Sequence, residues 1–432
     1  MAIFVAKTCD YIIEVLLYFL LIFSPLAYGS VQVLPLTIIE STSFLILSIW
    51  LVKQIFVPAL NLIKASFWVP VILFISLVIF QLSPLPKEIL GFLSPKHLYI
   101  FRTFVPGEAL SQVKYYFTIY KEPTLFKLYE LLSYISVFFV LLNTLETKKQ
   151  FKRLILVIIA MGFLVSMIGI AKGFAYPFIN KNHFAGYMEM TSFMAIGYLL
   201  TDLDKQKRII FSFMAIVAIL GLFLSLSRAG LLCFLFSLGL MLYLLKLRKG
   251  IHKKSRLILG IIIFTFLFML IARIEPFLER VSTLFKKETI SVDARWIIWK
   301  DSLRIIRDFP FFGTGLGTFK NIYPMYKTLV IQSSVFQAHS DFLQLISETG
   351  FLGFGLVFCF LYLFFKNIFK AWLSHHYLFA KGIALGGSCA AFSLFLHSFF
   401  DFNLQIPANA LLITVVMSLS YKVVFLKENE VR

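Results

Sequence analysis

Hydrophobic residues in this chain are grouped into continuous runs of about 20 residues, separated by shorter polar stretches. A run of that length suits a helix that crosses a bilayer, whereas a strand of a membrane barrel would be about half as long and would alternate in polarity. Backbone amides find no partners in lipid, so such runs must form helices if they are not barrel strands. The pattern therefore predicts an all-α polytopic membrane protein with about twelve transmembrane helices, over residues 11–29, 31–52, 67–83, 126–145, 153–172, 185–201, 209–225, 229–245, 257–274, 350–367, 380–398 and 404–425.

Two long polar segments interrupt the spans, at 84–125 and at 275–349. We interpret residues 1–432 as a single integral membrane domain from which these two segments project. The fourth and sixth predicted spans are the least apolar, because the fourth contains Lys127 and Glu130 and the sixth contains Glu189.

Lysine and arginine in the short loops predict the orientation of the chain. On one side these loops carry most of the basic residues, whereas the short loops of the other side hold only Lys172, Lys181 and Arg228. Basic residues favour the cytoplasmic side, and long loops do not follow this rule. We therefore expect both termini in the cytoplasm. Both long loops, 84–125 and 275–338, are expected on the outer face.

The composition indicates which classes of molecule can bind this protein. The 432 residues are 59% hydrophobic and 15% charged, against about 25% charged in soluble domains. The net charge of +19 is spread over the inter-span loops, so we expect membrane lipids and no nucleic acid as partners. The first span lacks a signal-peptide cleavage pattern and is expected to be retained. The cysteines show neither metal-ligand spacing nor an obvious disulfide pair: Cys9, Cys233, Cys359 and Cys389.

Polar side chains recur at four separate junctions on the predicted outer face, and the orientation was derived without them. NKNHFAG precedes the sixth span, SLSRAG lies in a very short turn, VFQAHSDFLQ ends the second long segment, and HSFFDFNLQIPANA joins the last two spans. We expect these junctions to form one site on the outer face. Its candidate residues are Asn180, Lys181, Asn182, His183, Arg228, His339, His397, Asp401 and Asn403.

Two arginines are candidates for binding phosphate, because guanidinium makes charged, bidentate contacts with phosphate oxygens. Arg228 lies at a span end, where it could instead be a snorkelling anchor. Arg295 lies in a helical pattern with Trp296, Trp299, Leu303 and Ile306, typical of an amphipathic helix at the membrane interface. FFGTGLGTF is similar to a phosphate-binding glycine loop, but no strand precedes it, which favours a tight turn.

The histidines allow several interpretations. His339, His183 and His397 could be buried and hydrogen-bonded, or could bind or activate a substrate. Their separation gives no metal-ligand spacing, and no D-x-D motif is present, so we expect neither a metal nor another cofactor.

These motifs together resemble the O-antigen ligase and polymerase superfamily. The resemblance rests on QLSPLPKEILGFLSP, NKNHFAG, SLSRAG, the R-x-x-x-W spacing from Arg295 to Trp299, GTGLGTF, the run from His339 to Gly350, and HSFFDFNLQIPANA. It implies a GT-C-like membrane glycosyltransferase of the bacterial inner membrane, which transfers a glycan from undecaprenyl diphosphate without a metal and with inversion. It also implies that Arg228 and Arg295 bind the donor diphosphate and that His339 is the base on the acceptor hydroxyl.

For the acceptor, three alternatives remain open. A ligase transfers to lipid A-core, a polymerase to a second lipid-linked glycan, and a third group to protein hydroxyls. We favour a ligase, because the single histidine and paired arginines are most similar to that group. We expect Asn180, Lys181, Asn182, His183, Trp299, His397 and Asp401 to contact substrate. A transporter or flippase is the alternative of another class, but it would place ionisable groups at mid-bilayer and show repeat symmetry.

Overall fold

The computed structural model describes residues 2–57, 62–104, 114–173, 175–247, 252–271, 289–328 and 335–426. Over these ranges the chain is almost entirely helical. Within them the β structure is one antiparallel pair, β1 (Pro84–Leu85) with β2 (Tyr115–Tyr116), in which Pro84 is opposite Tyr116. The α-helices are α1 (Ala2–Leu26), α2 (Val33–Phe56), α3 (Trp68–Leu82), α4 (Lys87–Leu93), α5 (Pro95–Phe104), α6 (Lys121–Thr144), α7 (Lys148–Lys172), α8 (Lys181–Leu199), α9 (Lys205–Leu224), α10 (Arg228–Lys246), α11 (His252–Ile271), α13 (Thr289–Asp308), α14 (Phe319–Ile322), α15 (Asp341–Ser374), α16 (Leu378–His397) and α17 (Pro407–Val423). Short 3₁₀ turns are η1 (Tyr28–Ser30), η3 (Tyr323–Met325) and η4 (Asn403–Gln405).

The prediction of an all-α polytopic membrane protein is confirmed. Among the described residues, eight helices are long and apolar enough to cross a membrane: α1, α2, α6, α7, α9, α10, α15 and α16. Three shorter apolar helices, α3, α17 and residues 256–268 of α11, fall on three further predicted spans. The remaining span corresponds to α8. Residues 272–274, at the end of the ninth predicted span, lie outside the described residues, as do 105–113, 275–288 and 329–334 of the long segments.

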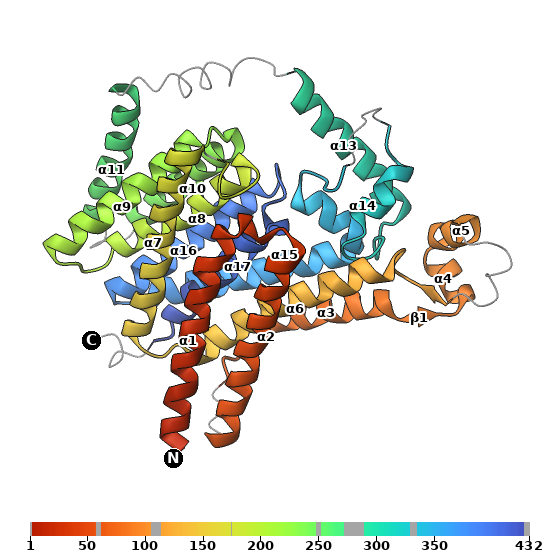
Figure 1. Ribbon diagram of the computed structural model, residues 1–432, viewed down its shortest axis with the longest axis horizontal. Helices are drawn as coiled ribbons and strands as arrows, with labels where there is room; N and C mark the ends of the chain where they lie inside the picture. Colours follow the sequence, from red (N-terminus) through yellow and green to blue (C-terminus); the bar gives the residue numbers. More distant parts are fainter. Residues whose placement is uncertain are drawn as a thin grey trace.

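Helix α8 lies at the centre of the bundle (Figure 1). Every residue from Asn182 to Leu199 is buried, and its main neighbours are α16, α9 and α7. At its crossing with α16 the backbones are so close that a Cβ on Gly386 would lie 2.7 Å from the Cα of Gly197. Small residues allow this approach between membrane helices. The least apolar of the membrane helices is therefore the one that protein, rather than lipid, surrounds.

The charged pair of the fourth predicted span lies on α6. Lys127 Nζ is 2.8 Å from Glu130 Oε2, one helical turn away, and the hydroxyl of Tyr134 donates to Glu130 Oε1 at 3.2 Å. Ionisable groups inside membrane helices usually pair with one another. This pairing explains how α6 accommodates two charges in an otherwise apolar sequence.

The two long segments, 84–125 and 275–349, which are predicted to lie on the outer face, pack against each other on one side of the bundle (Figure 1). Ile298 and Ile305 of α13 form a small hydrophobic cluster with Phe319 of α14, and Ile100 of α5 packs against this cluster. The cluster also contains Ala338, the residue before His339. The amphipathic helix predicted around Arg295 is thus confirmed as a helix that holds the chain on which His339 lies.

The apolar residues predicted to form one face of this helix lie on two sides of it. Ile306 of that face is buried, but Trp296 and Leu303 are each 56% exposed. The reason is that α13 has two apolar sides: one packs on α14, and the other, with Trp296 and Leu303 two turns apart, faces outward. The outward side remains free for the membrane interface.

The glycine-rich segment FFGTGLGTF surrounds a carboxylate of its own chain. The amides of Gly317 and Phe319 donate to Glu348 at 2.8 and 3.1 Å, and the amide of Leu316 donates to Gln81 Oε1 at 3.1 Å. Gly313, Gly315 and Gly317 all have positive φ, as such a turn requires. The interpretation as a tight turn is supported, because the amides that could hold a phosphate already hold Glu348.

Helix α15 changes direction at Gly350, where φ is 64° and ψ is −174°. The residues before this glycine belong to the outer segment, and the apolar residues after it form the predicted membrane span. A Cβ at Gly350 would lie 2.2 Å from the carbonyl oxygen of Phe311. Both the backbone conformation and the space thus require glycine.

Gly350→Ala is therefore expected to lower the free energy of unfolding by about 2–4 kcal/mol, the sum of backbone strain and overpacking. Thermal unfolding of the detergent-purified protein measures this. Gly355→Ala is the matched control on the same helix, because nothing lies within 4 Å of its Cβ position. Equal melting temperatures for the two variants would contradict the role given to Gly350.

Candidate functional site

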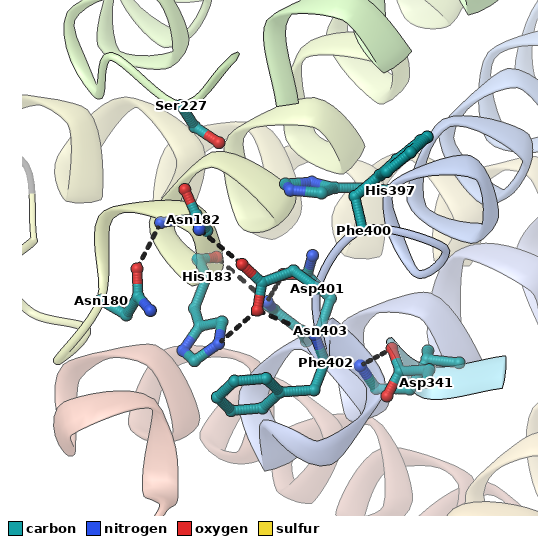
Figure 2. A network of polar contacts seen from close by, with 12 residues as sticks. Asn180, Asn182, His183, Ser227, Asp341, His397, Phe400, Asp401, Phe402 and Asn403 are labelled. Atoms are coloured by element: carbon teal, nitrogen blue, oxygen red, sulfur yellow. Dashed lines mark hydrogen bonds and ion pairs between the residues drawn. The ribbon is translucent and has the colours of Figure 1, made fainter. Parts of the chain in front are cut away.

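Asp401 is the centre of a buried polar network between α16 and α17 (Figure 2). Asn182 donates through Nδ2 to Asp401 Oδ2, and Nε2 of His183 lies 3.7 Å from Oδ1. Arg295 donates to Oδ2 at 3.2 Å. One carboxylate thus joins the start of α8 to α13 of the outer segment.

The start of α8 is fixed by its own cap. The side chain of Asn180 accepts a hydrogen bond from the amide of Asn182, and Lys181 occupies the first helical position between them. On the far side, Asn409 of α17 donates to the carbonyl of His183 at 3.0 Å. These contacts direct Asn182 and His183 toward Asp401, and the positive end of the α8 dipole lies beside that carboxylate.

Arg295 contributes a cation that remains accessible. Its guanidinium donates to the carbonyl of Phe400 and to Asp401, both at 3.2 Å, yet 33% of the side chain is exposed. A guanidinium has five N–H donors in a planar fork. Arg295 is therefore held in place by Asp401 while it remains open to an anion from outside.

His339 lies at the same site, across the ring of Phe402. The ring centroids of His339 and Phe402 are 5.1 Å apart, and those of His183 and Phe402 are 4.6 Å apart. His339 has φ of 52°, a left-handed conformation that is uncommon for a residue with a side chain. Trp299 donates to the carbonyl of Ala338 at 3.1 Å and so holds the backbone directly before it. The indole N–H of Trp299 is thus used in a hydrogen bond to the backbone next to His339, and this bond positions His339.

The electrostatic environment favours a neutral imidazole at His339. Burial lowers its pKa; Asp401 opposes this change, while the positive charge of Arg295 adds to it, and the net pKa is below 6.5. A histidine that is neutral near pH 7 can accept a proton.

Asp401 remains ionised for the opposite reason. Burial alone would raise its pKa, but the contact with the His183 imidazole and the charge of Arg295 hold the pKa well below its usual value. The site therefore combines a buried carboxylate, a cation and an imidazole whose pKa is lowered.

His397 is the last residue of α16 and is fully buried, like Asp401. Its Nδ1 is 2.7 Å from Glu189 Oε1, and the hydroxyl of Ser393 donates to the other oxygen of Glu189 at 2.6 Å. This position suits support of the 398–405 segment more than contact with a substrate.

Arg228 is brought to the same end of α8 by the first turn of α10. Ser227 caps that turn and lies beside Asn182 on the side away from Asp401 (Figure 2). A Cβ on Gly230 would lie 3.0 Å from Glu189 Oε1, so the start of α10 is packed directly on α8. Arg228 thus begins a helix that borders the network at Asn182.

Asp341 belongs to this network although the sequence pattern did not single it out. Its amide donates to the carbonyls of Ser398 and Asp401 at 2.9 and 3.2 Å, and its Oδ2 accepts from the amide of Leu404 at 3.0 Å. Phe402 and Asn409 were missed in the same way. Asp341 lies within HSDFLQ, and Phe402 and Asn409 lie within DFNLQIPANA. Both segments are predicted to lie on the outer face, and this prediction was the available signal.

The arrangement can hold an anion and remove a proton next to it. Arg295 is the accessible cation, His339 is the imidazole beside it, and Asp401 contacts both Arg295 and the start of α8. Across the described ranges, no three His, Cys, Asp or Glu side chains are grouped so that they could hold a metal ion.

Comparison with known proteins agrees with the motifs. A family model described as O-antigen ligase matches residues 213–358, which include Arg228, Arg295 and His339. No curated protein matches the chain.

Proposed function

Since this chain belongs to the O-antigen ligase and polymerase superfamily, we propose that it is an inverting, metal-independent glycosyltransferase that moves a glycan from undecaprenyl diphosphate to an acceptor hydroxyl. In this proposal it is a multi-pass protein of the bacterial inner membrane, with both termini in the cytoplasm and the site on the periplasmic face. The donor is the lipid-linked glycan, and the preferred acceptor is lipid A-core.

One observation carries the proposal. Arg295, Asp401 and His339 come from separate parts of the sequence, and they share one network at the end of α8. A cation that is held but exposed, beside a base kept neutral, matches what transfer from a diphosphate requires.

The mechanism follows from the chemistry of the leaving group. Arg295, with Arg228 beside the start of α8, binds the diphosphate, and these contacts strengthen as negative charge develops on the leaving oxygen. His339 takes the proton of the acceptor hydroxyl, and the resulting oxygen nucleophile attacks the anomeric carbon from the face opposite the diphosphate. The diphosphate leaves as an anion that needs no protonation, so no second acidic group is required, unlike in a glycosidase.

The direct test is transfer in vitro. Purified protein in nanodiscs, given an undecaprenyl-diphosphate-linked glycan and lipid A-core, is expected to form glycosylated lipid A-core and to release undecaprenyl diphosphate. No release of undecaprenyl diphosphate with any acceptor would refute the proposal.

The acceptor is decided by deletion of the gene. For a ligase, we expect free core together with long glycans that remain on the lipid carrier. Core capped with one repeat would instead indicate a polymerase, and loss of glycan from a protein would indicate a protein O-oligosaccharyltransferase.

Activity is expected to survive chelation. Because the proposed steps use only side chains, EDTA at millimolar concentration should leave the transfer rate within about twofold of the untreated enzyme, a change smaller than the loss of a catalytic group would cause. A loss of transfer that Mg²⁺ or Mn²⁺ restored would show that a metal takes part.

A further inference from the structure

An apolar groove of about 440 Å³ lies between α10, α15 and α16, and no residue of the candidate site lines it. Its volume falls in the range of ligand pockets, about 300–1,000 Å³. Ala384 and Cys389 of α16 are buried and form its floor, whereas Tyr362 and Phe369 of α15 are exposed along one edge. Leu240 of α10 lies on the other edge. The groove is therefore open at its side toward the surrounding bilayer.

The length of the groove corresponds to one half of the membrane. It extends along α15 from Tyr362 to Trp372 and along α16 from Ala384 to Phe392. At a rise of 1.5 Å per residue, these lengths are about 15 Å and about 12 Å. The hydrocarbon core of a bilayer is about 30 Å thick, so one leaflet contributes about 15 Å. The groove thus fits a molecule that belongs to a single leaflet.

This leaflet is the one opposite to the candidate site. Arg228 begins α10 and His397 ends α16, and the site lies at these two helix ends. The groove instead lies along the second halves of α10 and α15, which end on the predicted cytoplasmic side. A molecule in the groove therefore comes from the predicted cytoplasmic leaflet and is not the one bound at Arg295.

The charges around the groove are all positive. Lys366 lines the groove at the end of the span predicted over 350–367, Lys370 follows one turn later, and Lys246 ends α10. Neither α10 nor residues 351–400 contain an aspartate or a glutamate. Within the described ranges Lys366 forms no ion pair, and its Nζ lies 5.5 Å from the centroid of the Tyr362 ring. The helix segments that form the groove thus provide cations and no anion.

Trp372 marks the level of the lipid headgroups. Its Nε1 donates to the carbonyl of Lys381 at 3.1 Å, which joins the end of α15 to the start of α16. Tryptophan is enriched where membrane helices meet the headgroup layer. Lys366 and Lys370 lie within two helical turns of Trp372, so their ammonium groups reach that layer.

We propose that this groove binds an anionic phospholipid of the cytoplasmic leaflet, with an acyl chain along the floor formed by α16 and the phosphate at Lys366 and Lys370. Apolar contact alone would select no lipid, because the bilayer is as apolar as the groove. Selection comes from charge, since basic pockets between membrane helices on the cytoplasmic side bind anionic headgroups. The inference does not depend on the proposed enzymatic function.

Lys366→Gln tests the headgroup contact, with Lys205→Gln as the matched control. Lys205 is an exposed lysine at the start of α9, also on the predicted cytoplasmic side, and it does not line the groove. Native mass spectrometry of the full chain measures retention of phosphatidylglycerol against phosphatidylcholine. Lys366→Gln is expected to lower the ratio about fivefold, the effect of one basic side chain on an anionic headgroup, and Lys205→Gln to leave it unchanged.

Leu240→Trp tests the chain contact, with Leu232→Trp as the matched control. Leu240 lines the groove, whereas Leu232 on the same helix is 61% exposed and lies outside it. The indole in the groove should displace the acyl chain, so Leu240→Trp is expected to lose bound phosphatidylglycerol while Leu232→Trp retains it.

Melting temperature gives a second readout of the same site. A ligand that binds the folded protein stabilises it. Phosphatidylglycerol added to phosphatidylcholine nanodiscs is expected to raise the melting temperature of wild type and Lys205→Gln more than that of Lys366→Gln. Equal melting temperatures of all variants in phosphatidylcholine alone show that each is folded.

Two results would overturn the proposal. One is the same phosphatidylglycerol preference in wild type, Lys366→Gln and Leu240→Trp, which would mean that the groove selects no lipid. The other is a dimer of the full chain that Leu240→Trp abolishes, which would mean that a second copy of the protein covers the groove.

Discussion

His339→Asn is expected to lower glycan transfer about 10²–10⁴-fold, the usual contribution of a positioned general base. Asparagine is chosen because it tolerates the left-handed backbone at this position, where φ is 52°, so the change removes the imidazole and leaves the fold intact. Expression and melting temperature should therefore match wild type.

The pH profile gives a second readout for His339. Only the neutral imidazole can accept the proton, and its pKa is lowered from 6.5 by burial and by the charge of Arg295. The midpoint of the decline in rate at low pH should thus lie below 6.5, the ordinary pKa of histidine, with one ionisation on the acid limb.

His376→Asn is the control for His339. It removes an exposed imidazole from the turn between α15 and α16 and should leave both the rate and the pH profile unchanged. Transfer by His339→Asn at a rate near that of wild type would remove His339 from the mechanism. An acid limb that persisted in the variant would assign the ionisation to another group.

Arg295→Lys is expected to lower kcat/KM on the order of 10²-fold, the scale of losing one preorganised donor to a developing charge. Lysine keeps a positive charge near Asp401, so the buried carboxylate is not left without a cation. It loses the planar fork, which contacts the Phe400 carbonyl and Asp401 together and leaves donors for phosphate.

Arg304→Lys on the same helix is the matched control for Arg295. Arg304 is 53% exposed and lies 3.6 Å from Asp301 in a surface pair, so its replacement should change the rate by less than about twofold. If Arg295→Lys retained full turnover with the undecaprenyl donor, Arg295 would be an anchor for Asp401 and not a ligand of the diphosphate.

Most of the fold could be predicted from hydropathy, because span length is fixed by the bilayer. The spans with buried charges were the least certain, and the structure gives the reason. Glu189 lies on the helix that has only protein around it, and Glu130 is paired with Lys127. Hydropathy scores a helix as if lipid surrounded it. In these two helices, side chains of the protein hydrogen-bond the charged groups instead.

The glycine-rich segment illustrates a limit of motif analysis. Its glycines do cradle a carboxylate, but the carboxylate is Glu348, more than 25 residues farther along the chain. The spacing of the glycines predicts the turn, and only the tertiary structure identifies what the turn holds.

For the site, the sequence could identify the junctions but not their connections. Asp401 was predicted as a contact to substrate, and the structure gives it the role of a hub for Asn182, His183 and Arg295. Phe402 and Asp341 act through backbone and ring contacts, and such contacts have no pattern in a single sequence. A sequence motif can therefore identify a polar residue such as Asp401, whereas the residues that position it, such as Asp341, are identified only in the structure.

The burial of α8 has a consequence for how the protein responds to its membrane. A helix that touches lipid must tilt or shift when the hydrocarbon layer becomes thicker or thinner. Every residue of α8 from Asn182 to Leu199 is buried within the protein, and so the peripheral helices absorb such mismatch while the height of Asn182 and His183 is set by their protein neighbours. Growth temperature and acyl-chain length can then change around the molecule without altering the position of Asn182 and His183 relative to Asp401.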